Sequence, residues 1–218
     1  IERSGKTKKV KITRINGAFA VAEYVAEKLS GGGCAEIIAN TVKDAQKMYK
    51  IFKNDGRFRT VLYHASFTDT DRTRKEKEIL KLIGKGSTAE NRDMTVIIGT
   101  QPLEQSLDTD ADILITQPCP VDSLIQRIGR LFRHEREDRP DGFREPECVL
   151  WMDEDGGIPI GTKYVYLEYT VKRTLDIIGE NIVTPDDVTY LINAVYDTDS
   201  LTEHEKAEYE GFLYRYIN

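Results

Sequence analysis

Short apolar runs alternate with amphipathic segments along the first 150 residues, and this alternation constrains the fold more than any other feature of the sequence. Several runs are continuous Val/Ile stretches, which are typical of strands covered on both faces. The expected strands are residues 8–15, 34–39, 60–63, 95–99, 113–116 and 147–152, and the expected helices are 19–29, 41–52, 70–82 and 122–132. The pattern predicts an α/β domain with a mostly parallel sheet flanked by helices.

The pattern changes after residue 160. Residues 163–178 and 186–196 have helical spacing, and Thr184 and Pro185 are typical of a cap and first turn at the start of the second helix. Residues 197–218 hold six acidic and two basic residues. We therefore expect a main lobe over 1–160, linker helices over 161–196, and an acidic tail or the start of another domain over 197–218.

Composition excludes some classes of protein. No apolar run approaches the roughly 18 residues of a membrane span, which argues against a transmembrane protein. Cys34, Cys119 and Cys148 form no CxxC pair, so a reducing, cytoplasmic location is expected without a zinc ribbon or disulfide framework. The net charge is −6, but residues 126–139 contain five arginines, so a locally basic groove on an acidic body is possible. Because the chain begins at Ile1 rather than Met, we expect it to be part of a longer protein.

The densest chemical signal is the segment QRIGRLFRH at residues 126–134. Arg130 and Arg133 are three residues apart and would share one face of a helix end. Two guanidinium groups there suit phosphate oxygens and the charge that develops during phosphoryl transfer. The alternative is a surface arginine face paired with nearby acidic residues.

Polar residues also follow the expected strands, where parallel sheets bind ligands. Thr100 and Gln101 follow one strand, and Asp108 lies farther along, where it could accept a hydrogen bond from a ribose hydroxyl. Asn40 and Thr41 would bind a phosphate or only cap a helix, and His64 is either near a nucleic-acid face or part of the core.

The segments TQPLEQSLDTDADILIT (100–116) and CPVDSLIQRIGRLFRH (119–134) resemble motifs V and VI of superfamily 2 helicases. They are most similar to the pattern of the type I CRISPR-associated helicase–nuclease family, TQxxEQSLDxDxDxLIT followed by CPxDxLxQRxGRLxRH. IIANTVKDAQ (37–46) and LYHASFTDTDR (62–72) resemble further family segments, although Ala65 stands where a serine is usual. The resemblance extends over residues 37–196.

This resemblance implies a RecA-like fold and the second lobe of an ATP-dependent, 3′-to-5′ single-stranded DNA translocase. A first RecA-like lobe would hold most of ATP and Mg²⁺, an HD nuclease domain would cut DNA, and the Cascade surveillance complex would be a partner. The resemblance implies catalytic roles for Arg130 and Arg133. It assigns ATP contacts to Asp108, Gln126, Arg127 and Gly129, and DNA contacts to Asn40, Thr41, Ser66, Thr100 and Gln101.

Several motifs of a complete helicase–nuclease are missing from these 218 residues. There is no GxxxxGK[ST] loop, DExH box or His-Asp dipeptide, so we expect the chain alone to be inactive. The series Asp108, Asp110, Asp112 is spaced like a calcium loop, but Ile113 replaces the required glycine, and no metal site is expected. The alternatives are a lobe of another superfamily 2 RNA or DNA helicase, or a non-catalytic RecA-like nucleic-acid-binding module.

Overall fold

Parallel strands form the centre of the molecule, and an antiparallel strand extends the sheet at one edge. The computed structural model describes residues 7–198 and 201–217. The sheet order is β3 (Arg59–Tyr63), β4 (Thr95–Gly99), β2 (Cys34–Ile38), β5 (Ile113–Thr116), β6 (Glu147–Met152), β1 (Lys8–Asn16) and β7 (Asn181–Thr184). Only β7, which pairs with β1, runs antiparallel to its neighbour in this sheet.

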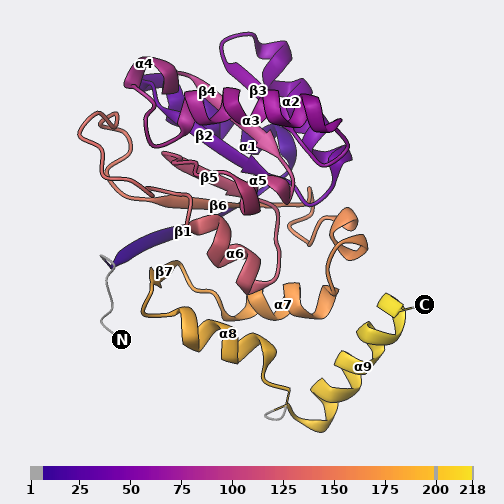
Figure 1. Cartoon of the computed structure of the whole chain (residues 1–218). Helices are drawn as coiled ribbons and strands as arrows, with labels where there is room; N and C mark the ends of the chain where they lie inside the picture. The colour runs from indigo at the N-terminus through magenta and orange to yellow at the C-terminus, as the bar shows by residue number, and fades with distance from the viewer. Residues whose placement is uncertain (1–6, 199–200, 218) are drawn as a thin grey trace.

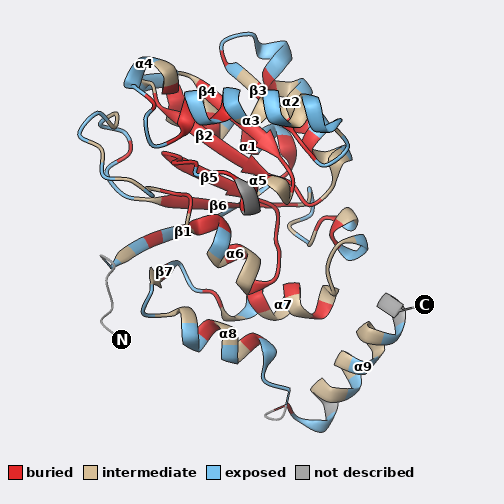
Figure 2. Ribbon diagram, in the orientation of Figure 1, coloured by how far each residue is buried: buried red, intermediate tan, exposed pale blue. Residues whose placement is uncertain are grey.

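Helices cover both faces of the sheet (Figure 1). In β4, Val96 and Ile98 pack with the core under α1 (Ala18–Lys28) and α2 (Val42–Asp55), whereas Ile97 points to the opposite core. That second core lies under α3 (Asp69–Ile83), α5 (Pro102–Ser106) and α6 (Val121–Ile128). Figure 2 shows the central strands as buried, as expected for a parallel sheet covered on both sides.

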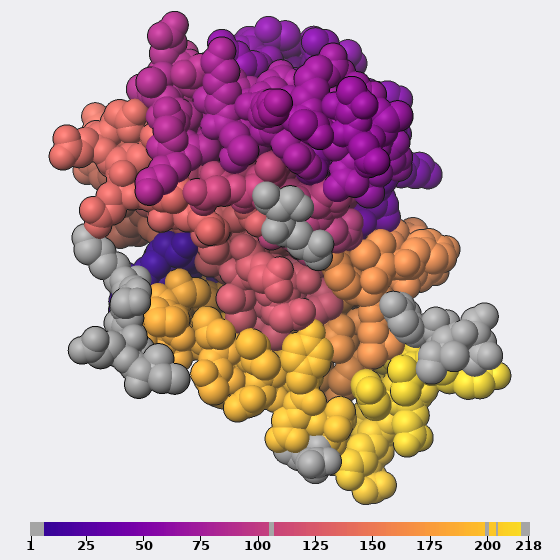
Figure 3. Space-filling model, in the orientation of Figure 1, coloured from indigo at the N-terminus to yellow at the C-terminus, as the bar shows by residue number. Residues whose placement is uncertain are grey.

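The remaining elements are η1 (Leu29–Gly31), α4 (Ala89–Arg92), η2 (Ile160–Tyr164), α7 (Glu168–Ile177), α8 (Val188–Tyr196) and α9 (Glu203–Ile217). Helix α8 packs against α6 and α7, and α9 contacts α7, where the rings of Tyr169 and Tyr209 lie 5.0 Å apart. Figure 3 shows α9, in yellow, at the periphery of the molecule.

Threonine caps start three of the helices. Thr41, Thr68 and Thr88 each accept a hydrogen bond from the backbone N–H three residues later, at the starts of α2, α3 and α4. Each cap satisfies one of the backbone donors that a helix start leaves free. Because α2 and α3 follow β2 and β3, their caps lie at the carboxyl edge of the sheet.

The predicted α/β class with a mostly parallel sheet is confirmed, but the predicted helix over 122–132 is too long. Helix α6 ends at Ile128, and Phe132 has a positive φ of 50°, a conformation that a helix cannot continue through. Arg130 and Arg133 therefore do not share the face of a helix. Residues 84–93 and 102–106, which were not expected to be helical, contain α4 and α5.

The expected helix over 163–178 is divided into η2 and α7. The expected helix over 186–196 is confirmed as α8, which begins at Val188, but its predicted cap is wrong. Thr184 ends β7 instead of capping a helix, because the open edge of β1 pairs with residues 181–184. The acidic tail contains α9, while residues 199–200 and 218 lie outside the described part of the chain.

Candidate functional site

The segment that follows β4 is held tightly against β3. A Cβ on Gly99 would lie 2.2 Å from the carbonyl oxygen of Tyr63, so a side chain cannot be accommodated there without movement. The backbone N–H of Thr100 donates to that same oxygen at 3.3 Å. Thr100 is consequently buried, and Gln101 is half-buried at the start of α5.

Arg127 lies inside the molecule and ties this segment to α6. Its Nε donates to Glu104 Oε2 at 2.7 Å, and its Nη atoms donate to Thr116 Oγ1 at 2.6 Å and to the Tyr166 hydroxyl at 2.9 Å. The side chain is fully buried. Arg127 was expected to contact ATP, but in this arrangement it joins α5, β5, α6 and the chain before α7.

Arg130 is also turned inward. Its Nη atoms donate to the carbonyl oxygens of Leu107 and Glu104, and only 5% of the residue is exposed. Burial lowers the pKa of this guanidinium, while the charge of Glu36 raises it. We call this placement of Arg130 the retracted position.

Arg133 and Asp108, both expected at the nucleotide, lie together at the surface. Arg133 Nε is 2.6 Å from Asp108 Oδ1, and the side chains are 43% and 49% exposed. His134 Nε2 lies 3.2 Å from the same oxygen. Of the two predicted catalytic arginines, only Arg133 therefore presents much of its side chain to solvent.

A buried arginine–aspartate cluster beneath this surface was not predicted. Asp110 lies 2.5 Å from Arg136 Nε and 2.6 Å from Arg139 Nη2, and Asp112 contacts Arg139 and lies 2.6 Å from Arg92 Nη2. Both carboxylates are fully buried. Bonds with the Arg139 and Arg136 guanidiniums lower the pKa of Asp110 despite the opposing effect of burial. This cluster fixes the loop before β5 against the chain that follows α6.

The sequence contained a signal for this cluster. Arginine occupies every third position from 127 to 139, and aspartate every second position from 108 to 112. Two complementary series of charges favour pairing with one another over two separate solvated faces. The aspartate series was considered only as a calcium loop, and within the described residues no cluster of His, Cys, Asp and Glu could hold a metal ion.

The residues expected at DNA lie at the carboxyl ends of β2, β3 and β4. Asn40 is buried and donates to Pro118 O at 2.7 Å and to Thr162 Oγ1 at 3.0 Å, while Gln101 Nε2 donates to Asn40 O at 3.0 Å. Thr41 caps α2, and Ser66 is exposed after β3. The structure brings Asn40 and Gln101 together, whereas Ser66 lies on a separate loop.

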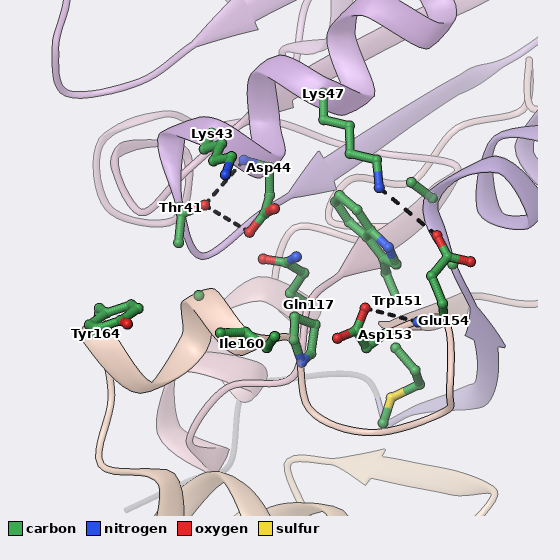
Figure 4. Close-up of a pocket in the computed structure, with 15 residues that line it drawn as sticks. Thr41, Lys43, Asp44, Lys47, Gln117, Trp151, Asp153, Glu154, Ile160 and Tyr164 are labelled. Carbon is green, nitrogen blue, oxygen red and sulfur yellow. Dashed lines mark hydrogen bonds and ion pairs between the residues drawn. The ribbon is translucent and has the colours of Figure 1, made fainter. Parts of the chain in front are cut away.

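A cavity of about 430 Å³ opens beside Thr41 at the same edge (Figure 4). Lys43 and Lys47 of α2 line one side, and Trp151 and the exposed Tyr164 also line it. Asp153 and Glu154 lie at the end of β6, and Glu154 is 3.9 Å from Lys47. The cavity combines lysines and aromatic rings with carboxylates, and sequence reasoning did not identify it.

A second cavity, of about 900 Å³, lies next to Arg133. Its lining includes Lys9, Arg133 and Arg144 together with Gly129 and Phe132. Gln126, three residues before Gly129, is exposed on α6, and Gly129 is half-buried. The surface around Arg133 is thus rich in cationic groups.

Comparisons with known proteins agree with these motifs. Residues 31–136 match the family model described as "CRISPR-associated nuclease/helicase Cas3, C-terminal". Cas3 from Streptococcus thermophilus is 40% identical over 188 residues, which cover 85% of this chain and 20% of that protein. Cas3 from Escherichia coli K12 is 34% identical over 194 residues, covering 86% of this chain and 22% of the relative.

Solved structures extend the agreement to the fold. T. fusca Cas3 with ATP superposes with a TM-score of 0.84 at 30% identity, covering 97% of this chain and 26% of that chain. The chain belongs to the Cas3 family, as its second RecA-like helicase lobe. A chain of a CRISPR RNA-guided surveillance complex, in a pre-nicking state, matches with a TM-score of 0.77 at 29% identity, covering 96% of this chain and 28% of that one.

This Cas3-type lobe spans about a fifth of the length of its curated relatives. Within the described residues, no helix is both long and apolar enough to cross a membrane.

Proposed function

We propose that the lobe is the C-terminal half of an ATP-dependent motor that moves 3′ to 5′ along single-stranded DNA in type I CRISPR interference. The observation that carries this proposal is the pairing of exposed Arg133 with Asp108 at the end of motif VI, beside the cationic cavity. Solved T. fusca Cas3 structures are named for ATP, AMPPNP and ADP complexes, which supports a nucleotide in the family.

On the nucleotide side, Arg133 would meet the γ-phosphate of an ATP held mainly by the first RecA-like lobe. Bound ATP, with Mg²⁺ from that lobe, supplies the phosphoryl group and its charge. The planar guanidinium of Arg133 suits the equatorial phosphate oxygens, and Asp108 would accept from the ribose once Arg133 turns toward phosphate. Gln126 and Gly129 are proposed neighbours, Arg127 would hold the motif in place, and Arg130 would join after leaving the retracted position.

On the DNA side, we propose that the strand crosses the carboxyl ends of β2, β3 and β4. The exposed Ser66 would contact a phosphate through its hydroxyl group, as proteins often do when they bind a nucleic-acid backbone. The Thr41 hydroxyl donates to Asp44 Oδ2 at 2.7 Å and would have to leave this bond to do the same. Asn40, Thr100 and Gln101 lie largely beneath the surface and would set the positions of the loops that the strand touches.

The proposed partners are the first RecA-like lobe, an HD nuclease domain, single-stranded DNA and Cascade, in the cytoplasm. The match to a chain of a surveillance complex supports the last partner. We propose residues 1–160 as the motor lobe, 161–196 as linker helices and 197–218 as an acidic tail or the start of the next domain, with β7 of the linker region completing the sheet of the lobe.

Directional movement tests this proposal. The protein that joins this lobe to its ATP-binding lobe should displace streptavidin from the 5′ end of a biotinylated single strand much faster than from the 3′ end, and only with ATP and Mg²⁺. Displacement from the 3′ end alone would show movement from 5′ to 3′ and contradict the proposed polarity. ATP hydrolysis that is insensitive to single-stranded DNA would contradict the motor.

The 218-residue chain alone should bind DNA weakly and hydrolyse no ATP. It supplies one half of the groove, and phosphate contacts should make its DNA affinity fall steeply as salt rises. Fluorescence anisotropy of a labelled oligonucleotide at several salt concentrations measures this dependence. DNA-stimulated turnover by the isolated chain would contradict the assignment of the phosphate cradle to another lobe.

A further inference from the structure

Glu36 is a buried carboxylate with no hydrogen bond of normal geometry. It lies in the middle of β2, paired in register with Ile97 of β4 and Leu114 of β5, and none of its surface is exposed. Neither carboxylate oxygen has a hydrogen-bond partner of normal geometry, although the Thr109 hydroxyl is near enough to lower the pKa of Glu36 as a donor. A buried charge of this kind is costly unless something nearby compensates it, so its presence at the centre of a sheet requires an explanation.

The compensating charge comes from Arg130. Glu36 lies on the face of the sheet that α3, α5 and α6 cover, as do its strand neighbours Cys34 and Ile38. Burial raises the pKa of Glu36 to about 7, and the Arg130 guanidinium opposes this rise most strongly. The Thr109 hydroxyl and the charge of Arg133 also lower this pKa, whereas the charge of Asp110 raises it.

Arg130 is in turn short of negative partners. The groups that hold its Nη atoms are all neutral: two backbone carbonyls and the Thr109 hydroxyl, at 3.4 Å. Its Nε has no hydrogen-bond partner. Among the other carboxylates that raise its pKa, Glu104 is bonded to Arg127 and Asp108 to Arg133. Glu36 is the one of these three that is committed to no other described cation.

Glu147 provides an internal comparison. It is also buried in the sheet, but it faces α1 and accepts hydrogen bonds from Thr13 at 2.6 Å and Tyr24 at 2.8 Å, and Lys28 Nζ lies 2.8 Å away. These partners lower its pKa to about 2 although burial acts in the opposite direction. A buried glutamate thus has hydrogen-bond and ion-pair partners on the face that α1 covers, whereas Glu36 on the opposite face has no hydrogen bond of normal geometry.

We propose that Glu36 is a positioning residue for Arg130: its negative charge retains the guanidinium in the retracted position, and protonation of Glu36 weakens that hold. A proton from solvent would neutralise the carboxylate, and the guanidinium would then exchange its carbonyl contacts for the surface. The retention of Arg130 by Glu36 involves this lobe alone, and only its consequence for ATP turnover rests on the proposed function.

Nuclear magnetic resonance of the 218-residue chain tests the positional claim. With ¹⁵N-labelled arginine, the Arg130 Nε–H signal is identified by its loss in Arg130→Lys. At pH 8, Glu36→Gln should speed solvent exchange of this signal by about tenfold or more, because the opening of the retracted position becomes easier. Glu147→Gln is the matched control and should leave Arg130 exchange unchanged. Equal exchange in the parent and Glu36→Gln would overturn the proposal.

A second measurement needs no variant at Glu36. In the parent chain, the Glu36 carboxyl carbon and the Arg130 Nε resonance should titrate together with one midpoint near pH 7. An Arg130 signal that does not respond when Glu36 titrates would also overturn the proposal, even if Glu36→Gln fails to fold.

The consequence for turnover has a separate readout. In the protein that carries both lobes, Glu36→Gln should flatten the dependence of kcat on pH between 6 and 8. A coupled titration of Glu36 and Arg130 with no change in this profile would confirm the positioning role and contradict the use of Arg130 at the nucleotide.

Discussion

The five arginines from 127 to 139 fall into a buried region and an exposed region, although they follow one another at the same spacing of three. Arg127, Arg136 and Arg139 have carboxylate partners inside the molecule, whereas Arg133 meets a half-exposed aspartate at the surface. Residue type and spacing alone therefore do not determine the role of each of these arginines. The position and burial of the opposing carboxylate decide whether an arginine holds the fold or remains available to a ligand.

The largest expected effect is the loss of Asp110 from the buried region. Asp110→Ala leaves Arg136 and Arg139 without their shared carboxylate and should lower the free energy of unfolding by about 5 kcal/mol, at the upper end for a broken buried pair. Urea unfolding measures the loss. Asp108→Ala is the matched control at the exposed end of the same series and should cost about 1 kcal/mol or less. Similar losses for both would remove the distinction between the two regions.

Arg127→Met should lower the free energy of unfolding by about 3–4 kcal/mol, because Glu104 is left buried without its cation. Adding Glu104→Gln should restore part of the loss, since the two residues act as a pair. Thermal and urea unfolding of the single and double variants check this coupling. Additive losses would show that Arg127 stabilises the fold through its other contacts.

Arg130 lies between the two regions, and the dependence of stability on pH should reveal its partner. Because the pKa of Glu36 in the folded chain is near 7 and above its ordinary value of 4.5, folding favours the protonated acid. Its contribution is therefore present in full below pH 4.5 and is lost as pH rises through 7, amounting to about 3 kcal/mol. In the parent chain, the free energy of unfolding should therefore fall between pH 5 and pH 8, and Glu36→Gln should abolish this part of the pH dependence. An unchanged slope would mean that Glu36 ionises as it does in the unfolded chain.

The smallest expected effect on stability belongs to Arg133. Arg133→Ala should change the free energy of unfolding by about 0–1 kcal/mol, because its ion pair with Asp108 is exposed to water and salt. Urea unfolding at low and high salt checks this. A loss comparable to that of Arg127→Met would place Arg133 in the structural group.

Sequence reasoning located the sheet and the motif segments, because buried Val/Ile runs and capping threonines act locally. It misplaced the arginines because local spacing does not show where a helix ends. Positive φ at Phe132 and the end of α6 at Ile128 separate Arg130 from Arg133. The role of Asp110 and Asp112 depends on contacts with Arg92, Arg136 and Arg139, which are 18 to 29 residues away in the chain.

The edge strand β7 was missed for a related reason. Its four residues gain their conformation from pairing with β1, which is about 170 residues earlier in the sequence. The Thr-Pro-Asp-Asp signal at residues 184–187 is locally consistent with a helix start, but the free edge of the sheet takes Thr184 into the strand.

We propose that exposed Arg133 serves the nucleotide, while Arg127, Arg136 and Arg139 hold the lobe together through their carboxylate partners. The most direct test is steady-state ATP turnover of folded Arg133→Ala in the protein that carries both lobes, saturated with single-stranded DNA. We expect kcat to fall by about 10³–10⁵ while ATP affinity and the unfolding curve change little, with no rescue by Arg133→Lys. Turnover within a few-fold of the parent would contradict the account.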